Sequence, residues 1–238
     1  MNIHNKKILA IIPARGGSKR IPKKNIRLLA GKPLIYYSIA SGLESEYIDR
    51  VVVSTEDDEV AAIAKKYKAE VVKRPKKLAG DKSKTIDAVF HAIQELGKKG
   101  YRPDIVVLLQ PTSPLRTSVD VDQAIELFLK NKCDSVVGVR ELDHPLYWTL
   151  KIDKGSLLPL FGWENVKIRS QDAPKNYVSN GAIFVITPES LEKNKGFFTK
   201  KTSAYIMPAE KSTDIDAESD FKLAELILKS YARNKNRK

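Results

Sequence analysis

Short, continuous apolar runs alternate with longer amphipathic stretches along most of the chain. The apolar runs are rich in Ile, Val and Leu and are bounded by polar or turn residues, which predicts buried strands. The predicted strands are Ile8–Ala14, Arg50–Ser54, Glu70–Lys73, Ile105–Gln110, Ser135–Val139, Ala182–Ile186 and Ala204–Met207. The predicted helices are Pro33–Leu43, Asp58–Tyr67, Ile86–Leu96, Val119–Lys130, Pro188–Glu192 and Glu218–Tyr231. This alternation indicates βαβ units, a mostly parallel sheet and the α/β class.

Two of the predicted helices begin next to a residue suited to capping. Asp57 precedes the second helix, and Thr85 precedes a stripe of apolar residues in the third. The side-chain oxygen of such a residue accepts a hydrogen bond from a free backbone N–H group of the first turn. We therefore expect Asp57 and Thr85 to be N-caps.

The alternation stops between Arg140 and Asn180. This segment holds both tryptophans and several other large aromatic residues: Tyr147, Trp148, Phe161, Trp163 and Tyr177. These side chains either pack on the body of their own subunit or belong to an insertion that docks on a second subunit, where exposed aromatic residues gain most. The residues by themselves leave both alternatives open.

The chain of 238 residues has the length of one α/β domain. Its 42 basic and 29 acidic residues give a net charge of +13, which raises the alternative of a nucleic-acid-binding protein. The lysines are scattered as pairs, however, and the one concentrated block is the tail at 233–238. We expect this charge to steer anionic small molecules and expect no nucleic acid partner.

The number of cysteines and the lengths of the apolar runs indicate where in the cell the protein is located. The single cysteine, Cys133, leaves no internal disulfide or cysteine-based metal site, which favours a reducing cytoplasm. No apolar run reaches the roughly 18 residues that a membrane span needs. We therefore expect a cytoplasmic protein without a membrane partner.

The stretch from Ile11 to Asn25, I-I-P-A-R-G-G-S-K-R-I-P-K-K-N, carries the strongest chemical signal. It follows the first predicted strand, at the sheet edge where open α/β folds bind ligands. Its glycines let the backbone approach an anion. It also carries more positive charges than a ligand with one acidic group would require: Arg15, Lys19, Arg20, Lys23 and Lys24. The alternative is a solvated basic turn, since neither a Walker A loop nor a G-x-G-x-x-G fingerprint is present. We interpret the loop as a polyphosphate site.

Two other segments leave predicted strands at the same edge. Arg74 ends the third strand, and residues 80–85 lead into a helix whose first amides are free for an anion or a base edge. Ser83 and Thr85 have the alternative role of capping that helix. Gln110 begins the turn L-Q-P-T-S-P-L-R, and its amide offers the donors and the acceptor that a pyrimidine edge needs. The alternative for Gln110 is a bond to the backbone of the turn.

Asp214 and Asp216 are the best metal candidates. In an extended segment, residues two apart point to one side and lie about 7 Å apart. Mg²⁺ prefers a few carboxylates together with phosphate oxygens. The alternative is that one of the two caps the helix that starts near Glu218.

A second substrate has candidate residues in the later part of the chain. Arg169, near Gln171, suits a bidentate contact with a carboxylate. Phe197 and Phe198 suit a sugar face or an N-acyl methyl group, and Asn180 begins N-G-A-I-F. Core packing is the commonest use of such aromatic residues and remains the alternative.

These motifs resemble the signature of the acylneuraminate cytidylyltransferase family, the CMP-sialic acid and CMP-legionaminic acid synthetases. The loop R-G-G-S-K-x-I-P-x-K-N, L-Q-P-T-S-P-L-R, N-G-A-I-F and D-I-D-x-x-x-D stand in the family's order. The resemblance implies a three-layer α/β/α, Rossmann-like nucleotidyltransferase in one domain, 1–231, with a dimerisation insertion at 141–179 and a basic tail at 232–238. It implies a homodimer that uses CTP to convert a nine-carbon 2-keto-3-deoxy sugar acid into a CMP-sugar, with release of pyrophosphate.

The resemblance also implies a role for each candidate residue. The nucleotide residues would be Arg15, Ser18, Lys19, Lys24, Asn25, Arg74, Ser83, Thr85 and Gln110. The sugar residues would be Gln110, Arg169, Gln171, Asn180, Phe197 and Phe198. Arg15, Lys24 and Arg169 would be catalytic, and Asp214 and Asp216 would hold a Mg²⁺ cofactor.

Two positions depart from the family pattern on the sugar side. Ser170 stands where relatives acting on bacterial sialic-acid analogues often have a second arginine, and Phe184 replaces a frequent tyrosine. A sialic or legionaminic acid is the expected substrate, with pseudaminic acid and Kdo as alternatives. The intact set of Arg15, Lys24 and the two aspartates argues against a non-catalytic, basic nucleic-acid-binding protein.

Overall fold

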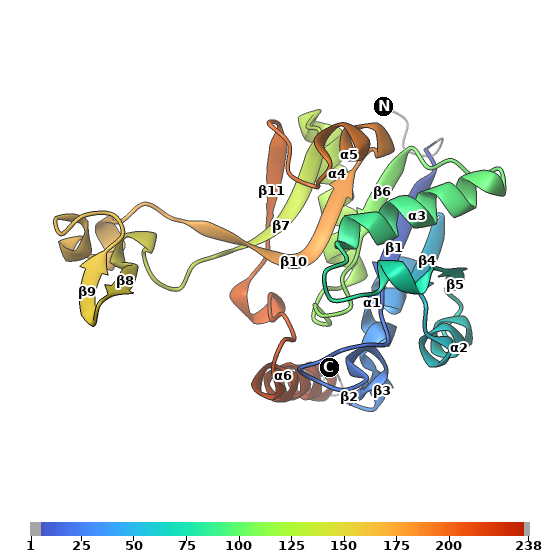
Figure 1. Cartoon of the computed structure of the whole chain (residues 1–238), viewed down its shortest axis with the longest axis horizontal. Helices are drawn as coiled ribbons and strands as arrows, with labels where there is room; N and C mark the ends of the chain where they lie inside the picture. The colour runs from blue at the N-terminus through green and yellow to red at the C-terminus, as the bar shows by residue number, and fades with distance from the viewer. Residues whose placement is uncertain (1–5, 236–238) are drawn as a thin grey trace.

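The structure is a computed structural model that describes residues 6–235, and it has a layer of helices on each face of a central sheet (Figure 1). Its strands are β1 (Ile8–Pro13), β2 (Leu28–Leu29), β3 (Lys32–Pro33), β4 (Arg50–Thr55), β5 (Glu70–Lys73), β6 (Ile105–Leu108), β7 (Ser135–Glu141), β8 (Leu150–Asp153), β9 (Ser156–Pro159), β10 (Tyr177–Ile186) and β11 (Thr202–Ile206). Its α-helices are α1 (Leu34–Leu43), α2 (Asp58–Lys66), α3 (Thr85–Lys98), α4 (Ser118–Asn131), α5 (Pro188–Asn194) and α6 (Glu218–Lys235).

The central sheet has seven strands in the order β11-β7-β10-β6-β1-β4-β5. β1 pairs in parallel with β4 and β6, β4 pairs in parallel with β5, and β7 pairs in parallel with β11. β10 alone runs against its neighbours, β6 and β7. The predicted mostly parallel sheet is therefore confirmed, and the carboxyl ends of β1, β4, β5 and β6 lie along one edge.

Alternate residues of the buried strands face different helix layers. Ile8, Ala10 and Ile12 belong to a core that includes residues of α1, α2 and α4. Leu9 and Ile11 belong to a second core, with residues of α3 and α5. Alternation of this kind follows from the two-residue period of a strand, and it confirms the three-layer arrangement. Within residues 6–235, no helix is long and apolar enough to cross a membrane.

The helix ends differ in part from the expectation. Asp57 caps α2 as predicted, because its side chain accepts a hydrogen bond from the Val60 N–H group at 2.9 Å. The prediction for Thr85 is wrong: Lys84 occupies the extended N-cap position without a side-chain bond, and Thr85 is the first residue of α3. α6 continues through Lys235, so residues 232–235 of the predicted tail are helical, whereas 236–238 lie outside the described residues.

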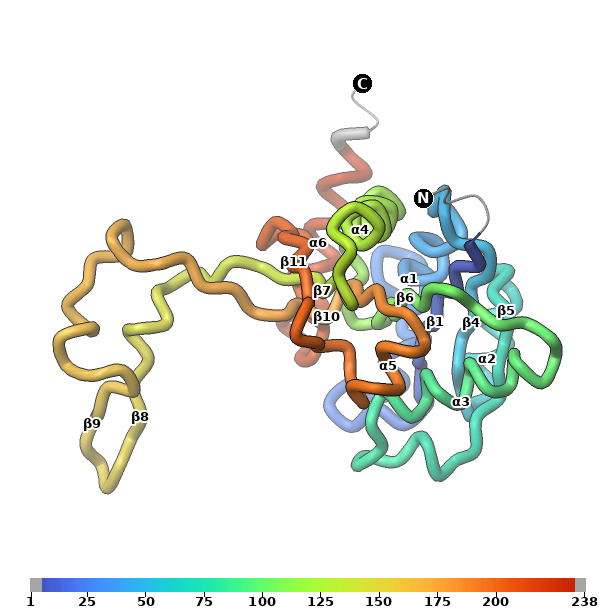
Figure 2. Tube along the Cα trace, turned by 90° about the horizontal axis from the view of Figure 1, so that it is seen from above, coloured from blue at the N-terminus to red at the C-terminus, as the bar shows by residue number. Residues whose placement is uncertain are grey.

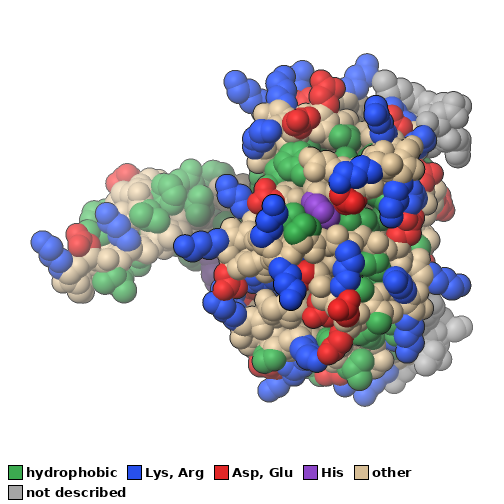
Figure 3. All heavy atoms as spheres, turned by 45° about the vertical axis from the view of Figure 1, so that its right-hand side comes forward, with side chains coloured by type: hydrophobic (Ala, Val, Ile, Leu, Met, Phe, Trp, Pro, Cys, Tyr) green, Lys and Arg blue, Asp and Glu red, His purple; other side chains and the backbone are tan. Residues whose placement is uncertain are grey.

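Residues 142–176, which we call the arm, leave the body between β7 and β10 (Figures 1 and 2). The arm contains the β8–β9 hairpin and holds itself together locally, since the Trp148 indole N–H donates to the Ile168 carbonyl at 2.9 Å. Its apolar side chains remain exposed, including 77% of Ile152 and 61% of Trp163. They gather on the projecting part of the molecule in Figure 3. The alternative that these aromatic residues pack on the body of their own subunit is therefore not observed.

Candidate active site

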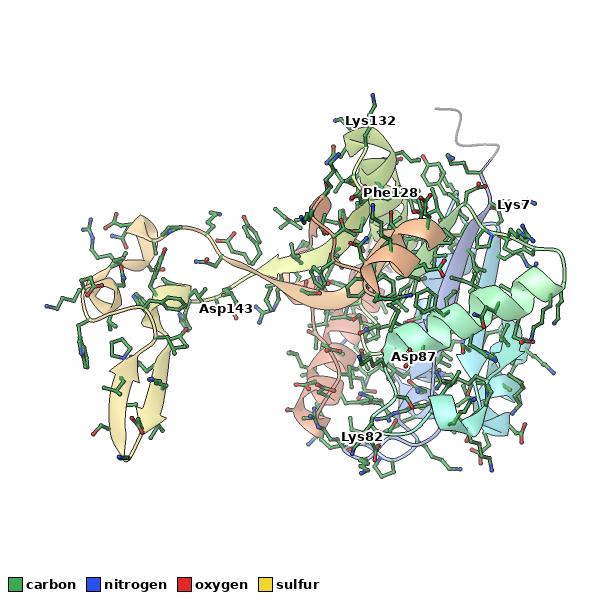
Figure 4. All side chains as sticks on the ribbon, turned by 45° about the horizontal axis from the view of Figure 1, so that its top comes forward. Lys7, Lys82, Asp87, Phe128, Lys132 and Asp143 are labelled. Carbon is green, nitrogen blue, oxygen red and sulfur yellow. The ribbon has the colours of Figure 1, made fainter. Side chains whose placement is uncertain are left out.

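A cleft of about 590 Å³ opens at the carboxyl edge of the sheet. Its lining includes all nine predicted nucleotide residues and both predicted metal ligands: Arg15, Ser18, Lys19, Lys24, Asn25, Arg74, Ser83, Thr85, Gln110, Asp214 and Asp216. A shallower hollow continues beside it and is bordered by Lys82 and Asp87, which Figure 4 labels. The fold thus brings together residues from four separate parts of the sequence.

The cationic loop, residues 15–24, is held against the sheet edge by bonds to its backbone. The buried Asn25 amide donates to the Arg15 carbonyl at 2.8 Å, and the Gly16 N–H group donates to Glu56 Oε1 at 2.8 Å. A Cβ atom on Gly16 would lie 2.3 Å from Asp57 Oδ2, so only glycine fits there. The close approach of this loop to the β4–α2 turn therefore explains Gly16 in the motif.

Glu56 is a site residue that the sequence analysis missed. Its second carboxylate oxygen accepts hydrogen bonds from Arg74 Nε and Nη2 at 3.1 and 3.0 Å, and both side chains are largely buried. Glu56 therefore joins Arg74 on one wall of the cleft to the cationic loop on another. The usable signal was its position two residues after the predicted strand Arg50–Ser54, at the same edge as Arg15 and Arg74.

An acidic residue also neutralises the outer part of the cationic loop. Asp81 lies 2.5 Å from the Lys19 ammonium and 3.4 Å from the Arg15 guanidinium. The hydrogen bond from Lys19 is the main reason that the pKa of Asp81 is lowered. Because Arg15 and Lys19 line the cleft, a bound polyphosphate and the Asp81 carboxylate would compete for the same two cations.

Asp214 and Asp216 lie in different electrostatic surroundings. Burial raises the pKa of Asp214, and the neighbouring charge of Asp216 adds to that rise. Asp216 is more exposed and lies 3.0 Å from Arg20 and 3.5 Å from Lys24. Within residues 6–235, no group of three or more His, Cys, Asp or Glu side chains is placed to hold a metal ion. Two carboxylates in one cleft with the cationic loop nevertheless fit Mg²⁺, which takes its other ligands from phosphate and water.

Neither aspartate of this pair caps α6. Asp220, inside the first turn of the helix, accepts hydrogen bonds from the N–H groups of Asp216 and Ala217 at 3.0 and 2.7 Å. These backbone bonds lower the pKa of Asp220. The carboxylates of Asp214 and Asp216 are therefore not used in capping and remain at the cleft.

The other sugar candidates do not line the cleft. Arg169 and Gln171 lie on the exposed arm, and Arg169 pairs with Asp172 at 2.6 Å. Asn180 is buried, and its amide donates to Ser212 Oγ at 3.0 Å. Phe197 and Phe198 pack beside Phe184, with ring centroids 5.1 and 6.5 Å from it. Of the predicted sugar residues, only Gln110 lines this cleft.

A cation-rich glycine loop at the carboxyl edge of a mostly parallel sheet, with two carboxylates in the same cleft, defines the chain as an α/β nucleotidyltransferase. Residues 9–232 match the model of the Cytidylyltransferase family. The chain belongs to this family.

Curated relatives support the same assignment. The chain is 36% identical over 230 residues to the N-acylneuraminate cytidylyltransferase of Escherichia coli. This alignment covers 96% of this chain and 54% of the Escherichia coli protein. It is 35% identical over 224 residues to the pseudaminic acid cytidylyltransferase of Campylobacter jejuni, and this alignment covers 94% of this chain and 97% of that protein. It is 36% identical over 225 residues to the CMP-N,N'-diacetyllegionaminic acid synthase of Legionella pneumophila, and this alignment covers 93% of this chain and 96% of that protein. The chain thus spans about half of the Escherichia coli protein and nearly all of the other two.

Solved structures support the fold. The CMP:2-keto-3-deoxy-manno-octonic acid synthetase complexed with CTP superposes with a TM-score of 0.72 at 14% identity, covering 94% of this chain and 99% of that one. A 4-diphosphocytidyl-2C-methyl-D-erythritol synthase superposes with a TM-score of 0.66 at 12% identity, covering 94% and 100%. At these identities, the likeness concerns the architecture alone.

The competition at the cationic loop gives a first prediction. Asp81→Asn should tighten the binding of inorganic pyrophosphate about two- to fivefold. The Asp81 charge would no longer compete for Arg15 and Lys19, and the gain is small because exposed ion pairs are weak. Titration calorimetry at low ionic strength measures this change. Glu59→Gln is the matched control: it removes the same charge from a pair with Lys23 at 2.7 Å, and Lys23 does not line the cleft. Equal tightening of pyrophosphate binding in both variants would mean that the effect comes from net charge alone and not from competition at the cleft.

Proposed function

We propose that the chain transfers the cytidylyl group of CTP to the anomeric hydroxyl of a nine-carbon 2-keto-3-deoxy sugar acid, releasing pyrophosphate. One observation carries the proposal: the predicted nucleotide residues and Asp214 and Asp216, drawn from separate motifs, line one cleft. Membership of the cytidylyltransferase family supports CTP as the nucleotide. The names of the relatives support a sugar acid as the acceptor.

In this reaction the anomeric oxygen attacks the α-phosphorus, and pyrophosphate leaves in line. Negative charge builds up on the leaving group, and the cations of the loop are in position to neutralise it. Lys24 is already oriented, because its ammonium donates to the Ile215 carbonyl at 2.5 Å and its side chain is only 15% exposed. Such fixed charges stabilise a transition state without reorganising during the reaction. The chain's contribution is therefore positioning and charge neutralisation.

We propose Mg²⁺ as the cofactor, held by Asp214 and Asp216. Burial disfavours the ionised form of Asp214, and a neighbouring cation would favour it. When bound, the ion would neutralise phosphate oxygens of the nucleotide as a Lewis acid. Lys24, which lies 3.5 Å from Asp216, would then be shared between the carboxylate and the triphosphate.

The proposed acceptor is a sialic or legionaminic acid. The three curated relatives named above differ in their sugar acids yet share 35–36% identity with this chain, so identity alone does not choose among them. The choice depends on the sugar side, where Ser170 and Phe184 depart from the family pattern. Pseudaminic acid and Kdo are the alternative acceptors.

A pyrophosphate-release assay tests the reaction directly. CTP should support turnover with a sialic or legionaminic acid, whereas UTP, ATP and GTP at equal concentration should support at least about tenfold less, as expected for a site that hydrogen-bonds one base. Each nucleotide is tested with each of the four acids. Equal use of a purine triphosphate would contradict the nucleotide assignment, and turnover with Kdo alone would move the acceptor to the octulosonate class.

Removal of one carboxylate charge tests the metal proposal. Asp216→Asn should lower kcat on the order of a hundredfold, the size found when one electrostatic group is removed from an active site, with little change in Tm. Asp220→Asn is the control, because it weakens the cap of α6 and should cost about 0.5–1 kcal/mol of stability while keeping the Mg²⁺ dependence. Unchanged turnover and Mg²⁺ dependence in Asp216→Asn would count against the metal role.

We also propose that the chain is a homodimer built through residues 141–179, with each arm reaching the cleft of its partner. The exposed apolar residues of the arm are typical of an interface core. Arg169 lies on the same arm, outside the cleft of its own subunit. Docking on a second copy would cover the apolar residues and could bring Arg169 to a sugar carboxylate.

Mixing two inactive variants tests this arrangement. Arg169→Ala and Lys24→Ala should each lose most activity, and equimolar mixing after subunit exchange should restore about a quarter of the sites in a two-fold dimer. Restoration fails if both residues act within one subunit. Sedimentation at micromolar concentration supplies the control, since a monomer of 26.7 kDa would refute the dimer.

A further inference from the structure

Two arginine–glutamate pairs join β4 to β5, one at each end of these strands. At the amino ends, the Arg50 fork donates to both oxygens of Glu70. At the carboxyl ends, the Arg74 fork donates to Glu56. The first pair is partly exposed and lies outside the cleft, whereas the Arg74 side chain is only 4% exposed and lines the cleft. The same chemistry therefore occurs twice on these strands, once at the candidate site and once away from it.

Glu56 occupies one edge of the Arg74 fork. Nε and Nη2 of Arg74 both donate to Glu56 Oε2, at 3.1 and 3.0 Å. Nη1 makes no hydrogen bond to any of residues 6–235, and it keeps some contact with solvent. Because Arg74 lines the cleft, Nη1 is the part of the fork that is left for a ligand.

Glu56 is itself held on two sides. Its Oε1 atom accepts from the Gly16 N–H group at 2.8 Å, and its backbone carbonyl accepts from Lys73 Nζ at 3.0 Å. The Arg74 N–H group donates to the Thr55 carbonyl at 3.0 Å, which keeps the two turns side by side. A carboxylate has one oxygen for Gly16 and one for Arg74, whereas an amide has a single oxygen and cannot accept from both.

We propose that Glu56 is a positioning residue that fixes the Arg74 fork with Nη1 directed at the nucleotide. The inference rests on the proposed function, in which Arg74 contacts the nucleotide. A planar fork recognises its ligand well only when neighbouring bonds set its orientation. Glu56 does not line the cleft, so it acts through Arg74 and not by contact with the ligand.

Charge and orientation predict opposite effects when the Glu56 carboxylate is removed. A carboxylate near the cleft repels an anionic nucleotide, so loss of its charge alone should lower the KM for CTP. Loss of orientation should raise this KM, because Arg74 would no longer be held toward the ligand. The direction of the change in KM therefore separates the two effects.

The measured quantities are KM and kcat for CTP in Glu56→Gln. The KM should rise about tenfold, the size expected for one hydrogen bond to a charged group, while kcat stays within about threefold of wild type. Glu70→Gln is the matched control: it weakens the pair at the other end of β4 and β5 and should leave the KM unchanged. An unchanged or lower KM in Glu56→Gln, or an equal rise in both variants, would overturn the proposal. Wild-type protein that does not use CTP would instead contradict the proposed function.

Arg74→Lys supplies a second variant, which keeps the charge beside Glu56. A lysine ammonium lacks a planar fork with one edge for Glu56 and another for the ligand, so the KM for CTP should rise. In this background, Glu56→Gln should raise the KM by less than about twofold, because residues that act through one another do not have additive effects. A further tenfold rise would mean that Glu56 acts independently of Arg74. If Glu56→Gln does not fold, a wild-type KM in Arg74→Lys would equally overturn the proposal.

Discussion

A cleft suited to a polyphosphate must hold several positive charges close together before its ligand arrives, and this constraint shapes the surrounding structure. Carboxylates from three different segments meet the cations: Glu56 after β4, Asp81 before α3 and Asp216 before α6. They differ in exposure. The Glu56 side chain is 13% exposed and fixes the loop and Arg74, whereas Asp81, at 51%, and Asp216, at 57%, can exchange partners with a ligand or a metal ion. Charge balance therefore also ties the cationic loop to the sheet edge.

The residues proposed for the two substrates stand on parts of the molecule that differ in burial. The candidate nucleotide residues stand at or beyond the ends of buried parallel strands, whose side chains fill two cores on opposite faces of the sheet. Arg169 stands on the arm, which leaves the body near Asp143 (Figure 4) and exposes apolar side chains. A well-packed body that carries the candidate nucleotide residues and a projecting arm suit an enzyme family whose members act on different acceptors.

β10 connects these two halves. It starts at the root of the arm, where Tyr177 pairs with Glu141, and its register shifts between Ser179 and Phe184. The irregular stretch carries Gly181, against which Gln110 rests, and Ala182, whose carbonyl Arg116 holds. A shifted register lets one antiparallel strand serve both the arm and the support of Gln110 at the cleft. The buried Asn180 amide, bonded to Ser212, stabilises the same bend.

The sequence by itself determined the long strands and the helices of the body, because each has an apolar period that matches its burial. It also predicted that the candidate nucleotide residues lie at one sheet edge, because the carboxyl ends of parallel strands meet there. Tertiary structure decided which charges meet. Glu56 pairs with Gly16 and Arg74, Asp81 pairs with Lys19, and Arg116 donates to the Ala182 carbonyl. These contacts join separate segments of the chain, where no local pattern marks the partner. Tertiary structure also decided that Lys84 rather than Thr85 is the N-cap of α3, since backbone geometry at that end depends on the preceding loop.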